Sequence, residues 1–321
     1  MKKLIAAGII LLVLGLIVGV ACFAAMGFDV KRFGTEESET KTTELLGDFR
    51  NIRIQGDTAH IAIYHPRFPT VDNSAKLESR ESEHRRTVVS VEDDTLTIRL
   101  VDERRWYDRI GISLKTPTLT LYLPEKEYGE LIIENSTGSI SIPGTYQFDS
   151  IRIDCSTGDV RCQASAETVS VTTTTGDITL SGLTAEQITA NVSTGRVQVS
   201  DVRCGSLETS GSTGNLFLIN VAAESGISVL RGTGDMRLEH GDAQVIRIQT
   251  STGDVKLAEA DAGELHIRTD TGDVTGTLRT KKVFITETDT GKVEVPKSIT
   301  GGECEITTDT GDIKIEILKQ G

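Results

Sequence analysis

Aromatic residues and proline are scarce in this 321-residue sequence. Aromatic side chains make up 4% of the chain, with a single tryptophan, and there are only 6 prolines. Aromatic side chains usually dominate the core of a large domain, so this composition fits better with a thin core of stacked small aliphatic residues. Sugar-stacking platforms are also few, which disfavours a carbohydrate-active enzyme.

Motifs of catalysis and cofactor binding are missing from the sequence. It contains no G-x-S-x-G nucleophile motif, no H-E-x-x-H zinc motif and no glycine-rich loop followed by Lys-Ser/Thr. None of the five histidines stands in a recognisable nucleophile motif. We therefore expect no catalytic residue, no cofactor and no metal ligand.

An excess of positive charge is also lacking. The 47 acidic residues outnumber the 34 lysines and arginines, and the net charge is −13. Nucleic acids are bound through clusters of Lys and Arg that neutralise phosphates, so a general nucleic-acid partner is excluded. The same charge repels an anionic membrane surface wherever basic residues do not cluster.

The one long hydrophobic run lies at the N-terminus. No charged residue interrupts the chain from Leu4 to Phe28, and a helix needs about 20 residues to cross a membrane. Residues 1–32 are therefore predicted to be a membrane anchor with a short cytoplasmic tail. A cleaved signal peptide fits less well because the run is long, and a lipoprotein fits less well because the residues before Cys22 lack the lipobox leucine.

We expect the rest of the chain to be extracytoplasmic, in a single-pass protein of the cell membrane. Residues 33–47 are polar and predict a flexible stalk.

Ten Thr-Gly pairs recur with a period near 19 residues. An apolar residue stands two positions after every glycine, nine of ten residues four positions after it are also apolar, and the residue between is usually polar. This alternation is typical of a strand with one buried face. The glycines predicted to form structural turns, because glycine adopts positive φ at no steric cost, are Gly138, Gly158, Gly176, Gly195, Gly214, Gly234, Gly253, Gly272, Gly291 and Gly311.

A 19-residue unit is too small to bury its own apolar face, so neighbouring units must stack. Residues 131–321 are predicted to form a parallel β-solenoid of about ten such units, here called rungs. An antiparallel meander, in which each Thr-Gly closes a hairpin, is the alternative. The turn threonines are expected in the core.

Individual rungs depart from the pattern. Arg231 falls at an inward position and must snorkel or mark a bulge, and the outward phase of Val283 and Ile285 predicts a register shift near Gly291. The final strand, Ile313 to Leu318, is expected to form an open edge.

Two features of the rungs, the Asp after the turn glycine and the four cysteines, each allow two interpretations. Asp follows the turn glycine in six rungs, and we interpret it as a structural turn residue, with weak Ca²⁺ binding as the alternative. Cys155, Cys162, Cys204 and Cys304 show no zinc-like spacing and are expected to be small core residues. A disulfide between Cys155 and Cys162 across one rung remains possible.

Residues 48–130 lack the Thr-Gly mark but keep the alternation, which predicts a divergent N-terminal β region of the same stack. Within it, the segment with Arg104, Arg105, Trp106 and Tyr107 holds the only Trp. One interpretation is a loop whose Trp covers the end of the stack. The other is an interaction loop for a partner or lipid headgroups, since Trp and Arg are enriched at such contacts.

The order of these features resembles the putative-adhesin domain family of bacterial envelope proteins, which includes LiaG-type membrane proteins. The matching segments are Phe49-Arg-Asn-Ile-Arg-Ile54, Asp94-Thr-Leu-Thr-Ile98, Leu121-Tyr-Leu-Pro124, Leu131-Ile-Ile-Glu-Asn-Ser-Thr-Gly138 and the repeats that follow. The resemblance implies a β-helical ectodomain on a single anchor, with no catalytic residues to carry over.

The leading hypothesis is a non-enzymatic, membrane-anchored extracytoplasmic β-solenoid scaffold that serves as an adhesin or cell-envelope interaction module. It predicts membrane attachment through the N-terminal helix and a protein or cell-surface partner. The alternatives are an accessory or sensory subunit of an envelope-stress signalling system and, least favoured, a carbohydrate-active β-helix enzyme.

Overall fold

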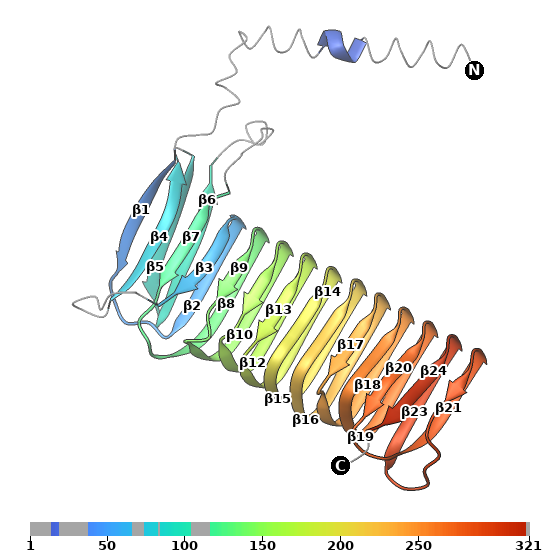
Figure 1. The fold of residues 1–321 in the computed structure, drawn as a ribbon. Helices are drawn as coiled ribbons and strands as arrows, with labels where there is room; N and C mark the ends of the chain where they lie inside the picture. Colours follow the sequence, from blue (N-terminus) through green and yellow to red (C-terminus); the bar gives the residue numbers. More distant parts are fainter. Residues whose placement is uncertain (1–13, 19–37, 66–73, 83, 104–115, 319–321) are drawn as a thin grey trace.

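The computed structural model describes residues 14–18, 38–65, 74–82, 84–103 and 116–318. Its strands join into one sheet that winds as a parallel β-solenoid of about nine turns (Figure 1). Residues 14–18 form a short helix. No helix within the described residues is long and apolar enough to span a membrane, and most of the predicted anchor lies outside them.

The strands follow one another from the N-terminal region into the regular rungs. The N-terminal strands are β1 (Ser38–Leu45), β2 (Asn51–Thr58), β3 (His60–Tyr64), β4 (Ala75–Ser82), β5 (Arg85–Glu92), β6 (Thr95–Asp102) and β7 (Thr118–Tyr122). The regular strands are β8 (Glu127–Thr137), β9 (Ile140–Ile142), β10 (Gln147–Thr157), β11 (Val160–Cys162), β12 (Ser165–Thr175), β13 (Ile178–Ser181), β14 (Thr184–Thr194), β15 (Val197–Thr213), β16 (Leu216–Thr233), β17 (Met236–Glu239), β18 (Asp242–Thr252), β19 (Val255–Thr271), β20 (Val274–Leu278), β21 (Lys282–Thr290), β22 (Val293–Glu294), β23 (Gly302–Thr310) and β24 (Ile313–Ile317).

Each rung has a long strand before the Thr-Gly turn and a short strand after it. Strand β10 pairs in parallel with β8 and β12, while β11 pairs in parallel with β9 and β13. Equivalent residues stack directly, so Ile151 lies between Leu131 and Val169. The parallel solenoid is confirmed, and the hairpin meander is wrong.

The N-terminal end is closed by antiparallel strands. Strands β2 and β3 make a first rung on β8 and β9, and β6 and β7 stack on its other side. Antiparallel strands β5 and β4 then cover β6 and β7, and β1 pairs with β4. Part of the predicted stalk is thus strand: residues 38–44 are polar but pair with β4 through their backbone, and Leu45 is buried in the core.

The C-terminal end departs from sequence order. Strand β23 lies between β19 and β21, and β24 lies between β20 and β22 (Figure 1). The rung of Gly291 is therefore the outermost, and the last rung of the chain inserts beneath it. The prediction of an open edge at the final strand is wrong for Ile313 and Lys314, because β22 pairs with both.

The register shift predicted near Gly291 is also wrong. Strand β21 pairs with β23 in constant register from Lys282 to Thr288. Val283 and Ile285 keep their outward phase because this rung is terminal, and Ile285 is 53% exposed. Register shifts occur elsewhere: the pairing of β15 with β16 shifts after Cys204, and the pairing of β19 with β20 shifts after Leu257.

The turn glycines stack backbone on backbone. All of them except Gly291 have φ between +127° and +154°, a range that favours glycine. A Cβ on Gly158 would overlap the carbonyl group of Gly138 below it, and the same holds along the stack. The N–H of Gly138 donates to the carbonyl of Thr157 in the next rung. The turn threonines are exposed, so the expectation that they join the core is wrong.

The residues after the turn glycines form a side-chain ladder. The backbone N–H of Asp273 donates to Asp254 Oδ1 at 3.0 Å, and the N–H of Asp254 donates to Asp235 Oδ1 at 3.1 Å. Asn215 fills the same role for Asp235. An Asp at this position supplies an acceptor to the next rung, which is a structural role and accounts for the exchange with Asn.

The interior is a continuous stack of mainly aliphatic residues, which also contains four cysteines and a buried arginine. Cys155, Cys162, Cys204 and Cys304 are free and buried, so the possible Cys155–Cys162 disulfide is not formed. Arg231 is 2% exposed and neither snorkels nor sits on a bulge. Its guanidinium occupies the space left by Gly211 in the rung below.

Candidate functional site

A groove runs along one corner of the solenoid, where the connection of each rung meets its long strand. Its floor is a ladder of small side chains in register across β14, β15, β16, β18 and β19: Ala185, Cys204, Ala223, Ala243 and Ala262. At a strand spacing of about 4.8 Å, these five rungs give a floor about 20 Å long. The groove has a volume of about 850 Å³.

The same ladder is filled by aromatic rings nearer the N-terminus. Phe148 stands beside Ala166 in the next rung and beside Tyr128 in the previous one. The rings of Tyr128 and Phe148 lie 5.6 Å apart, and Tyr146 packs on both. The hydroxyl of Tyr146 donates to the carbonyl of Leu123 at 2.8 Å, and burial raises the pKa of Tyr146 to about 12. The groove therefore begins at Ala185, one rung after the aromatic residues give way to alanine at Ala166.

Backbone irregularity accompanies the groove. Strand β16 carries one extra residue after Ala223, which shifts its register against β15 and β18. In β15, β16 and β19 the chain bends round this corner without leaving the strand conformation. Bulges of this kind are over-represented beside functional sites, because they redirect side chains.

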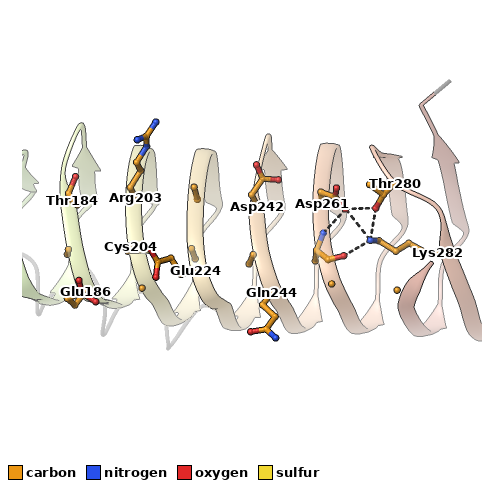
Figure 2. Close-up of a pocket in the computed structure, with 18 residues that line it drawn as sticks. Thr184, Glu186, Arg203, Cys204, Glu224, Asp242, Gln244, Asp261, Thr280 and Lys282 are labelled. Atoms are coloured by element: carbon orange, nitrogen blue, oxygen red, sulfur yellow. Dashed lines mark hydrogen bonds and ion pairs between the residues drawn. The ribbon is translucent and has the colours of Figure 1, made fainter. Parts of the chain in front are cut away.

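Polar side chains line both rims of the groove. Figure 2 shows Thr184, Arg203, Asp242 and Asp261 along one side, and Glu186, Glu224 and Gln244 along the other. Four of the lining residues are acidic and two are basic, so the groove carries a net negative charge. Asp242 also forms an ion pair with Arg279.

A buried lysine closes the C-terminal end of the groove. Lys282 is 3% exposed. Its Nζ donates to Thr280 Oγ1 at 2.8 Å, to Asp261 Oδ1 at 3.1 Å and to the carbonyl of Ala262 (Figure 2). All three lysine donors are therefore used, and Asp261 accepts further hydrogen bonds from Thr280 Oγ1 and from the N–H of Ala262. The cluster has a structural role, because its polar groups form hydrogen bonds with one another.

Cys204 is the one thiol among the groove residues. It is buried, and burial raises the pKa of its thiol to about 11. Nucleophilic cysteines have lowered pKa values beside cations or helix N-termini. Cys204 is therefore a floor residue and not a nucleophile.

The residues singled out from the sequence lie elsewhere. Arg104, Arg105, Trp106 and Tyr107 fall outside the described residues, and the turn glycines form the edge of the stack. The sequence patterns considered above did not predict the groove. The signal that would have found it is the position ten residues before the turn glycine, which changes from Tyr128 and Phe148 to Ala166 and Ala185.

The fold and the groove together define a capped, single-sheet β-solenoid with an elongated surface cleft. The family Toastrack DUF4097 matches residues 50–189 and 164–316, so the chain belongs to it. The resemblance to putative-adhesin domains is thereby confirmed. No curated protein sequence matches the chain.

Several solved structures match over most of the chain. A putative adhesin from Bacteroides fragilis is 14% identical, with 88% of this chain and 98% of that chain covered and a TM-score of 0.41. A putative lipid binding protein from Parabacteroides distasonis is 13% identical, with 88% and 99% covered and a TM-score of 0.48. A putative adhesin from Parabacteroides merdae is 9% identical, with 89% and 97% covered and a TM-score of 0.39.

Proposed function

We propose that the protein is a non-enzymatic scaffold of the cell envelope that binds an elongated partner along the corner groove. The observation that carries this proposal is the small-residue floor, which continues in register through five rungs. A floor of alanine lets a chain lie close to the backbone of every rung. Rims with regularly spaced polar groups offer it repeated hydrogen-bond partners.

The charge of the groove favours a partner that carries cationic groups. Glu186 and Glu224 are exposed on one rim, where they are free to pair with such groups. A hydrolytic role gains no support from the acids, because Asp242 and Asp261 are held by ion pairs with Arg279 and Lys282. The scaffold interpretation therefore stands above the carbohydrate-active enzyme.

Filling the groove tests the proposal. Ala243 is half-buried on the floor, so Ala243→Trp places an indole across the path of the partner. Ser228→Trp adds the same side chain to the exposed outer face of β16 and is the matched control. Full-length protein in detergent is mixed with isolated cell envelopes and sedimented. We expect Ala243→Trp to reduce the bound fraction at least tenfold and Ser228→Trp to leave it unchanged. Equal binding by both variants would refute groove binding.

Membrane attachment is the second part of the proposal. The apolar run from Leu4 to Phe28 would hold the solenoid outside the membrane, and β1 of the N-terminal cap is the strand nearest to it in sequence. Fractionation of cells expressing the full chain should place it with the membrane, accessible to protease from outside. Recovery in the soluble fraction would contradict the anchor. Cross-linking in the same cells, followed by identification of the captured proteins, distinguishes the two functions. A scaffold should capture an envelope partner, and a sensory subunit should capture a neighbouring membrane protein.

A further inference from the structure

One histidine and three glutamates, side chains of kinds that can bind metals, lie on the outer face of β19 and β23, away from the groove. His266 stands directly opposite Glu305 in the parallel pairing of the two strands. Glu264 and Glu303 lie two residues earlier on the same strands and therefore on the same face. The cluster exists only because β23 inserts beside β19, which brings together residues that are 39 positions apart.

The donor atoms are close enough to share one ion. A ring nitrogen of His266 and one carboxylate oxygen from each of Glu303 and Glu305 lie within 4.8 Å of one another. His266 Nδ1 is 3.1 Å from Glu305 Oε2. Ligands of a tetrahedral zinc ion, each about 2.0–2.2 Å from the metal, lie roughly 3.3 Å apart, so small rotations of the two exposed glutamates suffice.

The fourth side chain is placed to support the histidine. Glu264 Oε2 lies 3.6 Å from His266 Nε2, on the ring nitrogen that does not face Glu305. Metal-bound histidines usually donate their second N–H to a carboxylate, which fixes the tautomer and orients the ring. Glu264 therefore has the position of this supporting carboxylate.

Electrostatics at the cluster leave acidic charge to be neutralised. Three carboxylates surround one imidazole, and acidic residues facing each other across strands destabilise a sheet. Arg247 on β18 stands opposite His266, and Arg268 lies two residues further along β19. On the other side, β21 presents Val283 and Ile285 to Glu303 and Glu305, so the two glutamates have no cation opposite them on that strand.

We propose that His266, Glu303 and Glu305 bind a divalent ion of the zinc class, with Glu264 holding the imidazole and water completing the shell. Mixed nitrogen and carboxylate donors favour Zn²⁺ over Ca²⁺, which prefers six to eight oxygens. The ion joins β19 to β23 and so fastens the inserted last rung to the stack.

Zinc titration of the full chain in detergent tests the site. The protein is freed of any affinity tag, treated with chelator and exchanged into metal-free buffer. Calorimetry should show one Zn²⁺ per chain, and saturating Zn²⁺ should raise the melting temperature by about 3 °C or more, because the ion binds only the folded state. His266→Ala should abolish the heat and the shift. Glu264→Gln should weaken binding about tenfold or more.

His240 supplies the matched control. Its Nδ1 lies 3.7 Å from the carboxylate of Glu259, and its side chain is more exposed than that of His266. His240→Ala should leave stoichiometry and affinity unchanged. The proposal is overturned if wild-type protein gives no saturable Zn²⁺ heat, or if His266→Ala titrates like the wild type, since the ion would then be absent or bound elsewhere.

Discussion

Two separate constraints act on every turn glycine except Gly291: a backbone conformation that other residues avoid and a carbonyl group in contact from the neighbouring rung. Gly253 shows both, with φ +146° and Gly234 beneath it. Gly182 shows only the first, since φ is +66° and an added Cβ would meet nothing within 4 Å. The two positions therefore separate conformational strain from steric overlap.

Alanine substitution at these positions is the first prediction. Gly182→Ala should cost about 1–2 kcal/mol, the ordinary penalty of a left-handed residue. Gly253→Ala adds overlap with the Gly234 carbonyl and should cost more than about 3 kcal/mol. The free energy of unfolding from urea denaturation measures both. Equal losses would mean that the stack relaxes around a Cβ and that close approach is not the reason for glycine.

The ladder after the turns gives a second prediction. Asp254→Ala removes the acceptor for the N–H of Asp273 and should cost about 0.5–1.5 kcal/mol. Asp254→Asn keeps an acceptor oxygen and should stay close to wild type. Calcium should not raise the wild-type melting temperature at low millimolar concentration. If Asn proved as damaging as Ala, or calcium stabilised the wild type, the ladder would have to be reinterpreted as an ion site.

Arg231 gives a third prediction, because its charge is buried at a cost. Nε and Nη1 have no hydrogen-bond partner among the described residues, and burial lowers the pKa of Arg231 to about 10 from 12.5. At 1.36 kcal/mol per pKa unit, the charge costs about 3 kcal/mol. Arg231→Met keeps an unbranched side chain in the space beside Gly211 and should raise the free energy of unfolding by about 1–3 kcal/mol. Arg247→Met, on the exposed face, is the control and should change it by less than about 0.5 kcal/mol.

Among the elements, the regular strands could be predicted from sequence and the strand order at the end could not. The period-2 alternation beside the repeated Thr-Gly pairs predicts strands β10 to β20, because the same positions are buried in each of these rungs. Insertion of β23 between β19 and β21 leaves no trace in β23 itself, which alternates normally. The outward phase of Val283 and Ile285 marks β21 as unusual but does not reveal the strand order. The groove was not predicted for a related reason. Alanine and cysteine satisfy an apolar pattern as well as phenylalanine does, and only their smaller side-chain volume distinguishes them.

Hydrogen exchange tests the strand order directly. Strand β21 pairs with β23 on one side and is the outermost strand, while β23 is paired on both sides. Alternate amides of an edge strand face solvent and exchange from the native state. Amides of β23 should therefore exchange at least tenfold more slowly than the outward amides of β21, although β23 is nearer the C-terminus. Slower exchange in β21 would indicate sequential stacking instead.

At the scale of the whole molecule, a solenoid is nearly one-dimensional, and each rung is stabilised by its neighbours. A defect inside the stack weakens two interfaces, and a defect in the terminal rung weakens one. The antiparallel cap at the N-terminal end and the outermost Gly291 rung at the other end cover the core of the stack from both sides. Position along the stack should therefore decide the outcome of otherwise similar substitutions.

Gly253→Ala and Gly291→Ala provide this comparison. In both, the new Cβ faces the carbonyl of a stacked glycine, Gly234 or Gly311. Only Gly253 also has a positive φ, so the backbone strain of about 1–2 kcal/mol is subtracted from its loss before the two are compared. The Gly291 rung has no rung above it and can move outward, so Gly291→Ala should raise exchange in β21 and β22 while lowering the melting temperature by less than about 2 °C. Gly253→Ala should lower the melting temperature of the whole solenoid by several degrees. If the terminal substitution proved as damaging as the central one, the stack would unfold as a single unit and not by nearest-neighbour coupling.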